Sequence, residues 1–410
     1  MMLKKKLEMT LDAEGIRCEN DIKIAQSLLN DVLVQRVKSD FERIFEKGPM
    51  GVRRQLLSNS VRLSRSMSPA LHEMADHCIE QLGVDIPLEL YAYASPQFNA
   101  ACFKPEEGRL FVMFSSSLLE AFDESELMFV LGHEFGHHVY HHHDIPIGYI
   151  LNGPDRPSAS LALQIFAWAR YAEISADRAG AFCANNLDAV ARALFKLASG
   201  LTSQRVVNFN LSEFLAQLDE MQAVDAEPGK GAPMQDWFST HPFSPLRVKA
   251  LQLFHHSQLM QADGVGKQEL EIGVQALMGL MEPDYLEGHT QVAKVMRALF
   301  IAGAIAVANA RNGISDAEIK VLKEFMGEGF STEALNIDKL IDTLPKRINS
   351  VKEHASLTQR MQVVRDLCVI ARADGRMTDN ELLVLNSIAD GLDVPRSLLT
   401  HVLNMSQELD

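Results

Sequence analysis

Apolar residues recur at helical spacing through the first part of the chain. Between Ile24 and Phe45 they fall three or four positions apart, which predicts a long amphipathic helix. Gly48, Pro49 and Gly51 interrupt this pattern before a second helix that is rich in basic residues. Residues 1–66 are therefore expected to be helical throughout.

The pattern becomes a mixture of helical and strand periods from about residue 67. Alternation over Ile86–Ala94 and the short apolar run Arg109–Phe114 are typical of strands. The helices expected here are Leu71–Leu82, one that runs from Glu124 through His138 and His141–His143, and Ala159–Ala184. A loop rich in Pro and Gly, Ile145–Ser158, separates the last two. This part is predicted to be helices around a small β-sheet.

The last part of the chain contains an internal repeat. Ala310–Leu322 aligns without gaps on Ala373–Leu385, an offset of 63 residues. Ser315–Glu318 and Thr378–Glu381 both have the sequence of a capping box, in which a hydroxyl and a carboxylate bind the first amides of a helix. The repeat therefore predicts a helical domain with internal pseudo-symmetry.

The length and these patterns together predict several domains in a chain that is mostly α with a small β-sheet. A chain of 410 residues exceeds the roughly 250–300 residues of a single core. The expected parts are a basic helical region, a mixed α+β domain, a helical linker and an all-α domain, with boundaries 1–66, 67–258, 259–285 and 286–410.

Charge and composition exclude several classes of protein. The net charge is −15, of which residues 67–285 carry −16, so the clustered basic residues that nucleic-acid binding needs are absent there. The longest apolar run, Ala298–Ala308, is shorter than the roughly 18–20 residues of a membrane-spanning helix. Five scattered cysteines indicate buried thiols in a reducing compartment, and we expect a cytoplasmic protein.

The strongest chemical signal is the pentapeptide that begins at His133. His133 and His137 are four residues apart, so on a helix both imidazoles reach one zinc ion. Glu134 lies beside them and is predicted to act as the general base that takes a proton from the attacking water. We expect one Zn²⁺ per chain.

A catalytic zinc site needs a third protein ligand, and the sequence offers two alternatives. His143 stands at the position of a metzincin third ligand, but residue 140 is a Tyr where that pattern has a Gly. Glu173 and Asp177, four residues apart on an apolar helix, are the other alternative. On this alternative Glu173 binds the metal and Asp177 accepts the second N–H of a ligating imidazole.

Four features in order resemble the HtpX-like and CAAX-prenyl-endopeptidase-like zinc metallopeptidases, peptidase family M48, which are gluzincins. They are Asn99-Ala100; Glu126-Leu127 before His133–His137; Glu173 with Ala176-Asp177; and Ser239-Thr240-His241-Pro242 with Arg247. The resemblance covers residues 67–258 and implies an α+β zincin catalytic domain.

The resemblance also implies a role for each matching residue. The ligands would be His133, His137 and Glu173, with Glu134 as base. It further implies a role for His241 or Arg247 near the tetrahedral intermediate, with His241 the candidate donor to the oxyanion. Arg247 is otherwise grouped with Asp177, outside the ligands. Asn99 and Ala100 lie where an extended peptide would be bound by strand addition. Many relatives are membrane-embedded, so their substrates are not transferred to this chain.

The repeat resembles TerB-like tellurite-resistance domains. The second copy carries their Ala373-Asp374-Gly375 turn, whereas the first has Arg311-Asn312 in place of Asp-Gly. We therefore expect a module for regulation or for binding a protein partner, with stress response as a hint from the family.

The predicted protein is a zinc endopeptidase acting on peptides or unfolded proteins. The alternative is a catalytically silent, zinc-stabilised scaffold or chaperone-like protein. The basic helices before residue 66 are a candidate for peripheral membrane contact, against the simpler alternative of a solvated helix face.

Overall fold

The computed structural model describes most of residues 13–399. The described residues leave out 47–50, 156, 158, 203–206, 226–235, 237, 282–290, 312, 327–329, 333–334, 356, 375–376 and 397–398. The predicted break at Gly48 and Pro49, residues 282–285 of the predicted linker, and Asn312 and Gly375 of the repeats lie outside them.

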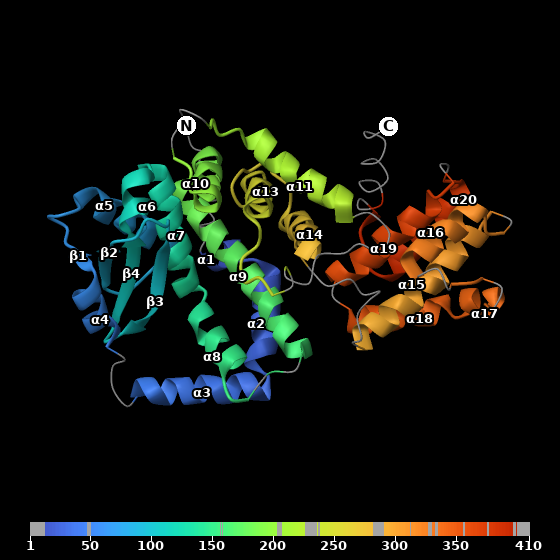
Figure 1. The fold of residues 1–410 in the computed structure, drawn as a ribbon, viewed down its shortest axis with the longest axis horizontal. Helices are drawn as coiled ribbons and strands as arrows, with labels where there is room; N and C mark the ends of the chain where they lie inside the picture. Colours follow the sequence, from blue (N-terminus) through green and yellow to red (C-terminus); the bar gives the residue numbers. More distant parts are fainter. Residues whose placement is uncertain are drawn as a thin grey trace, which may run out of the picture. The chain divides into compact units, whose positions relative to one another are not determined.

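The described residues form two compact units (Figure 1). The first contains those of Met1–Leu218 and Phe238–Val274, and the second those of Asp219–Trp237 and Gln275–Asp410. The N-terminal helices thus belong to the same unit as the predicted catalytic domain. The chain is mostly α with one small sheet, which confirms the predicted fold class.

The elements of the first unit alternate between helices and short strands. They are α1 (Ala13–Ile16), α2 (Glu19–Leu29), α3 (Val32–Glu46), α4 (Val52–Asn59), β1 (Val61–Leu63), α5 (Pro69–Leu82), β2 (Leu88–Tyr93), β3 (Ala100–Glu106), β4 (Arg109–Ser115), α6 (Ser116–Ala121), α7 (Glu124–Val139), η1 (His142–Asp144), α8 (Ile147–Asn152), α9 (Ala159–Ala184), α10 (Leu187–Ser199) and α13 (Ser244–His255). Helices α11 (Leu211–Asp225) and α14 (Lys267–Met278) begin in this unit and end in the second.

The sheet has four strands in the order β1-β2-β4-β3. Strands β2 and β4 are parallel, and the two outer pairs are antiparallel. Glu107 and Gly108, both with positive φ, form the tight turn between β3 and β4. Leu56 of α4 packs on Tyr91 and Phe111 of the sheet, and α7 contacts the edge strand β3. The sheet thus gives α7 a rigid neighbour.

Helices α7 and α9 form the centre of the first unit, and they approach each other through small residues. A Cβ atom added to Gly136 would lie 2.9 Å from the Cβ of Ala179, and one added to Gly180 would lie 2.4 Å from the carbonyl oxygen of Phe129. The two backbones are therefore nearly in contact. Helices α1, α2 and α13 also pack against α9.

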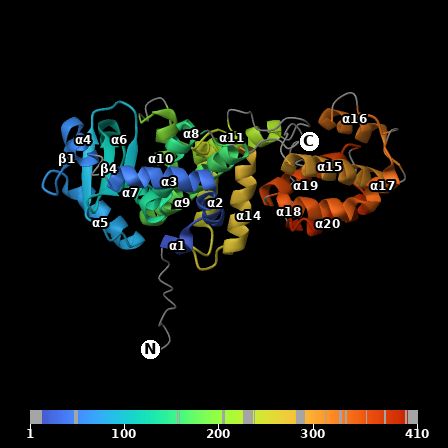
Figure 2. The ribbon, with the colours of Figure 1, turned by 90° about the horizontal axis from the view of Figure 1, so that it is seen from below.

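The second unit is built from the repeated helices. It contains η2 (Gly279–Met281), α15 (Gln291–Asn309), α16 (Asp316–Met326), α17 (Ile337–Asp342), α18 (Leu344–His354), α19 (Leu357–Ala371) and α20 (Asp379–Gly391). Helix α15 packs against α17, α18, α19 and α20 (Figures 1 and 2). It is thus the central helix of this unit.

The two repeats contact each other at equivalent positions. Arg311 forms an ion pair with Asp374, its counterpart 63 residues later. The backbone N–H of Ser315 donates to Glu318, and that of Thr378 donates to Glu381, with the return bonds also formed. Both predicted capping boxes are therefore confirmed.

One described helix, α15, is long and apolar enough to cross a membrane by length and composition. Its window Val292–Asn309 has a mean hydropathy of 1.6, and 61% of that window is buried inside the structure. The sequence prediction of no such helix considered only the uninterrupted apolar run Ala298–Ala308. The longer window also contains a few polar residues and is still apolar on average. Its burial is that of a core helix.

The structure corrects the prediction that residues 1–66 are helical throughout. The amphipathic stretch is divided at Asn30, where α2 ends, and the carboxylate of Asp31 binds the first amides of α3. Val61–Leu63 is a strand because it pairs with β2, a partner distant in sequence. Strand β3 was also missed, since its short pattern contains Pro105 and lies at the sheet edge.

Two corrections concern the segment after α7. The helix ends at Val139 instead of continuing through the histidines, because His141 adopts a left-handed conformation with φ of 57°. The predicted loop Ile145–Ser158 contains the short helix α8. The predicted helix Ala159–Ala184 is confirmed with the same bounds.

The packing of α7 on α9 predicts unequal effects for two helical glycines. Gly180→Ala should lower the free energy of unfolding by about 1–3 kcal/mol, because its Cβ meets the carbonyl oxygen of Phe129. Gly148→Ala in α8, with nothing within 4 Å, should instead be neutral or stabilise by up to about 1 kcal/mol. Urea unfolding of both variants checks this, and equal effects would contradict the close contact.

Candidate metal centre

Helix α7 carries two histidines toward one point. Its first turn is fixed by a capping box between Asp123 and Glu126, and Lys196 and Arg192 neutralise the buried Glu126. One turn apart on the same face, His133 and His137 place their Nε2 atoms 3.1 Å from each other.

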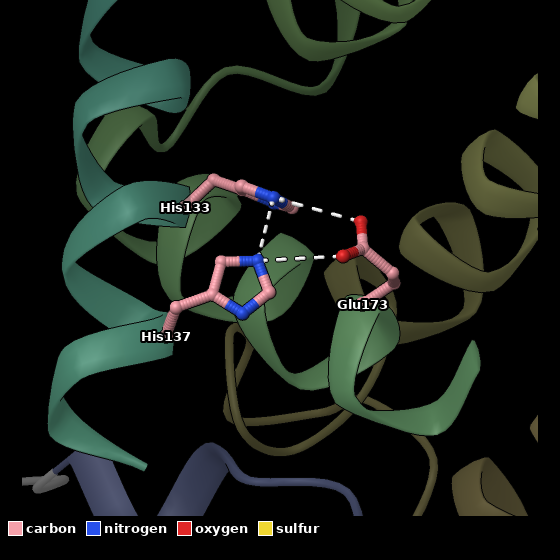
Figure 3. A group of neighbouring side chains, drawn as sticks. All are labelled: His133, His137 and Glu173. Atoms are coloured by element: carbon pink, nitrogen blue, oxygen red, sulfur yellow. Dashed lines mark hydrogen bonds and ion pairs between the residues drawn. The ribbon is translucent and has the colours of Figure 1, made fainter. Parts of the chain in front are cut away.

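Helix α9 brings Glu173 opposite these two rings (Figure 3). Its Oε2 lies 3.6 Å from Nε2 of His133, and its Oε1 lies 3.4 Å from Nε2 of His137. The three ligand atoms all lie within 4.8 Å of one another. Within the described part of the chain, His143, the alternative third ligand, contributes nothing to this group.

The donor set fits a zinc ion. Two imidazole nitrogens and one carboxylate oxygen are donors that zinc prefers, and donors of a tetrahedral zinc site lie about 3.3–3.6 Å apart. The three distances here run from 3.1 to 3.6 Å. Oε2 of Glu173 is buried and accepts no hydrogen bond from any described residue. Nη2 of Arg247 lies 3.6 Å from this oxygen, beyond hydrogen-bond distance, so a metal ion would satisfy it more fully.

The first ligand ring is held from behind by a charged pair. Nδ1 of His133 donates to Oδ1 of Asp177 over 3.0 Å. Arg247 donates to both oxygens of that carboxylate, over 2.8 and 2.6 Å. Asp177 is fully buried. This arrangement leaves Nε2 of His133 directed toward His137 and Glu173.

The charges of the site shift the pKa values of its carboxylates downward. Burial alone would raise the pKa of Glu173, but the hydrogen bond and charge of His137, with His133 and Arg247 nearby, lower it well below its usual value. Burial likewise opposes ionisation of Asp177, and Arg247 and His133 lower its pKa. Both groups are therefore ionised near neutral pH, the state that binds a cation or an N–H donor.

The second ligand ring is also held from behind, by two residues that sequence reasoning did not single out. Nδ1 of His137 lies 2.9 Å from Nδ1 of His142, whose Nε2 lies 3.0 Å from Oδ2 of Asp21. Asp21 is on α2 and fully buried. His142 was part of the recognised histidine run, but no signal in the sequence connects it with Asp21, more than 100 residues earlier.

The other predicted site residues lie at different distances from the metal group. Glu134 is buried on α7 and follows His133 directly in the sequence. Burial and the charge of Glu134 raise the pKa of Cys102 on β3 well above its usual value. His241 places Nε2 3.5 Å from Oε1 of Glu173 with its side chain 64% exposed, so it stands at the open side of the site.

Asn99 and Ala100 lie at the start of the edge strand β3. The side chain of Asn99 is exposed and donates to the hydroxyl of Tyr93. Neither residue has an atom in the metal group. Ala100 is thus the first residue of the strand that packs against α7, Asn99 directly precedes it, and neither belongs to the group of ligands.

Comparison with known proteins agrees with this geometry. Peptidase family M48 matches residues 66–153 and 156–254, and the family of tellurite resistance protein TerB matches residues 297–402. Plastoglobule-localized metallopeptidase 48, chloroplastic, from Arabidopsis thaliana is 30% identical over 193 residues, which cover 44% of this chain and 56% of that protein. The chain thus spans little more than half of the relative's length. No solved structure matches it.

The matched regions contain every predicted ligand as well as the internal repeat. They follow each other in the order that the sequence motifs predict. The chain therefore contains a region that matches peptidase family M48, followed by a region that matches the TerB family.

Proposed function

We propose that this chain is a zinc-dependent endopeptidase. The observation that carries the proposal is the convergence of His133, His137 and Glu173, with a glutamate next to the first ligand. The match of residues 66–153 and 156–254 to family M48 and the similarity to a metallopeptidase support a metalloprotease. The endopeptidase type and the identity of the metal are part of the proposal.

The residues around the site suggest how the reaction proceeds. When bound, zinc would activate a water molecule and polarise the scissile carbonyl. Glu134 takes the proton of the attacking water and passes it to the leaving amine. His241, at the open side of the site, donates to the oxyanion, and an extended substrate lies along the edge strand β3. Peptides and unfolded protein segments are the substrates that fit such backbone-directed binding.

A zinc-stabilised scaffold without catalysis is the second candidate. It needs the three ligands and Asp177, but it has no need of a general base. The presence of Glu134, which is buried and follows the proposed ligand His133 directly in the sequence, therefore favours the peptidase.

The TerB domain is proposed to regulate the peptidase or to bind a protein partner. A cytoplasmic location remains part of the proposal, and the plastid name of the relative belongs to that protein. Peripheral membrane contact is less favoured, because basic residues of α3 are paired within the chain. Arg36 lies 2.8 Å from Asp155, and Lys38 lies 3.2 Å from Asp144.

Replacing the proposed base should separate metal binding from cleavage. Glu134→Gln should retain bound zinc, because the ligands are unchanged, and lower the cleavage rate of an unfolded protein by about 10²–10⁴-fold. Zinc content and peptide release are the measurements. Glu124→Gln, an exposed glutamate on the same helix, is the matched control and should keep full activity. Undiminished cleavage by Glu134→Gln would reject this residue as the base.

The ligand assignment predicts a graded loss of metal. Glu173→Ala should abolish stoichiometric zinc binding, because only two protein donors would remain. Asp177→Asn should weaken the affinity by about 10–100-fold, since Asp177 orients His133 without touching the metal position. Titration against a chromophoric chelator measures both, with circular dichroism as the control for folding. Full zinc occupancy in Glu173→Ala would exclude it as the third ligand.

A further inference from the structure

A chain of three side chains connects the second ligand, His137, with the N-terminal helix α2. The distance from Nδ1 of His137 to Nδ1 of His142 is 2.9 Å. The distance from Nε2 of His142 to Oδ2 of Asp21 is 3.0 Å. Asp21 and His142 are both buried. We propose that Asp21 and His142 are positioning residues for His137, and that Asp21 sets the tautomer of His142 that leaves Nε2 of His137 available to zinc. The proposal rests on the proposed zinc site.

The direction of each hydrogen bond follows from the chemistry of the rings. If Nε2 of His137 binds a metal, its proton is on Nδ1, which therefore donates. Nδ1 of His142 must then accept, so the proton of that neutral ring is on Nε2. An ionised carboxylate can only accept, so Asp21 accepts the hydrogen bond that Nε2–H of His142 donates. Each link is satisfied in one orientation only.

Asp21 is itself held in place by two further donors. Nε of Arg17 donates to Oδ2 over 2.8 Å, and Nε1 of Trp168 donates to Oδ1 over 3.0 Å. The ring of Trp168 also packs edge-on against that of His142, with 5.9 Å between ring centroids. The carboxylate therefore has a fixed orientation, and it can impose that orientation on His142.

The segment that carries Asp21 is fastened to the helices around the site. The hydroxyl of Tyr140, the residue that caps α7, donates to the carbonyl of Ala13. Arg178 of α9 donates to the carbonyl of Ile16, and the backbone N–H of Cys18 donates to Ser175 of the same helix. Residues 13–21 are thus docked against α7 and α9.

This segment lies outside the part of the chain that matches family M48, which begins at residue 66. The left-handed conformation of His141 turns the chain so that His142 meets His137 instead of continuing along the helix. Helix α2 contacts α9, which carries the third ligand. Helix α2 therefore packs against the helices of the site and also supplies Asp21, which positions His142 and through it His137.

Exchanging the carboxylate of Asp21 for an amide tests this link. Both oxygens of Asp21 accept from N–H donors, Trp168 at Oδ1 and Arg17 with His142 at Oδ2. In Asp21→Asn the N–H₂ group therefore opposes a donor in either orientation, and the charged, fixed acceptor for Nε2 of His142 is lost. Where the N–H₂ group faces His142, that ring must accept from it and the proton on His137 moves to the nitrogen that should bind zinc. We expect the zinc affinity of the full chain to fall by about 10–100-fold.

A second variant guards against misfolding of the first. His142→Phe keeps an aromatic ring between Tyr140 and Trp168, and it leaves Asp21 its bonds to Arg17 and Trp168. It should also lower zinc affinity by about 10–100-fold, because His137 loses its acceptor. The d–d absorption of bound Co²⁺ should change in both variants, since the ring is no longer held.

The control is Tyr140→Phe. It removes the buried hydrogen bond between Tyr140 and the carbonyl of Ala13, but none of the hydrogen bonds that connect His137, His142 and Asp21. It should lower the melting temperature and leave zinc affinity and the Co²⁺ spectrum unchanged. Wild-type affinity and spectrum in both Asp21→Asn and His142→Phe would overturn the proposal. These readouts do not require cleavage, so a chain that binds zinc and cleaves nothing fails as a peptidase without affecting this test.

Discussion

The near-contact of helices α7 and α9 is the constraint on which the rest of the structure depends. The imidazoles of His133 and His137 reach the carboxylate of Glu173 because Gly132, Gly136 and Gly180 add no side chain of their own between the two helices. Glycine is costly inside a helix, by about 1 kcal/mol relative to alanine. Here that cost is offset because the glycines let α7 and α9 approach more closely than larger residues would permit. This approach brings the residues of the candidate metal site together.

Close packing brings a second problem, the burial of charge. Glu173 and Asp177 lie one turn apart and buried on a largely apolar helix, and isolated carboxylates in such a place are strongly unfavourable. The structure compensates Asp177 with Arg247 and His133, whereas one oxygen of Glu173 accepts no hydrogen bond from any described residue. Arg247 reaches Glu173 only through a longer ion pair of 3.6 Å. Asp177 is thus held by hydrogen bonds and orients a ligand, whereas Glu173 keeps an oxygen that can bind the proposed metal.

The two ligand rings are supported in related but different ways. His133 donates to a carboxylate directly, while His137 reaches one through His142. The first support comes from α9 and α13, within the family domain, and the second from α2, outside it. The proposed site therefore draws on residues from position 21 to position 247. A catalytic domain defined by its motif alone would lack one of its supports.

The sequence by itself determined the features that depend on local spacing. The i, i+4 rule places His133 with His137 and Glu173 with Asp177, capping boxes mark helix starts at Ser315 and Thr378, and the repeat predicts paired helices. Tertiary structure decided what depends on partners distant in the chain. Val61–Leu63 forms a strand because it pairs with β2. Helix α7 ends where it does because His141 adopts a left-handed conformation. Likewise, Asp21 acquired a place near the proposed site only when α2 docked on α9, because hydrogen bonds between distant residues leave no periodic trace in the sequence.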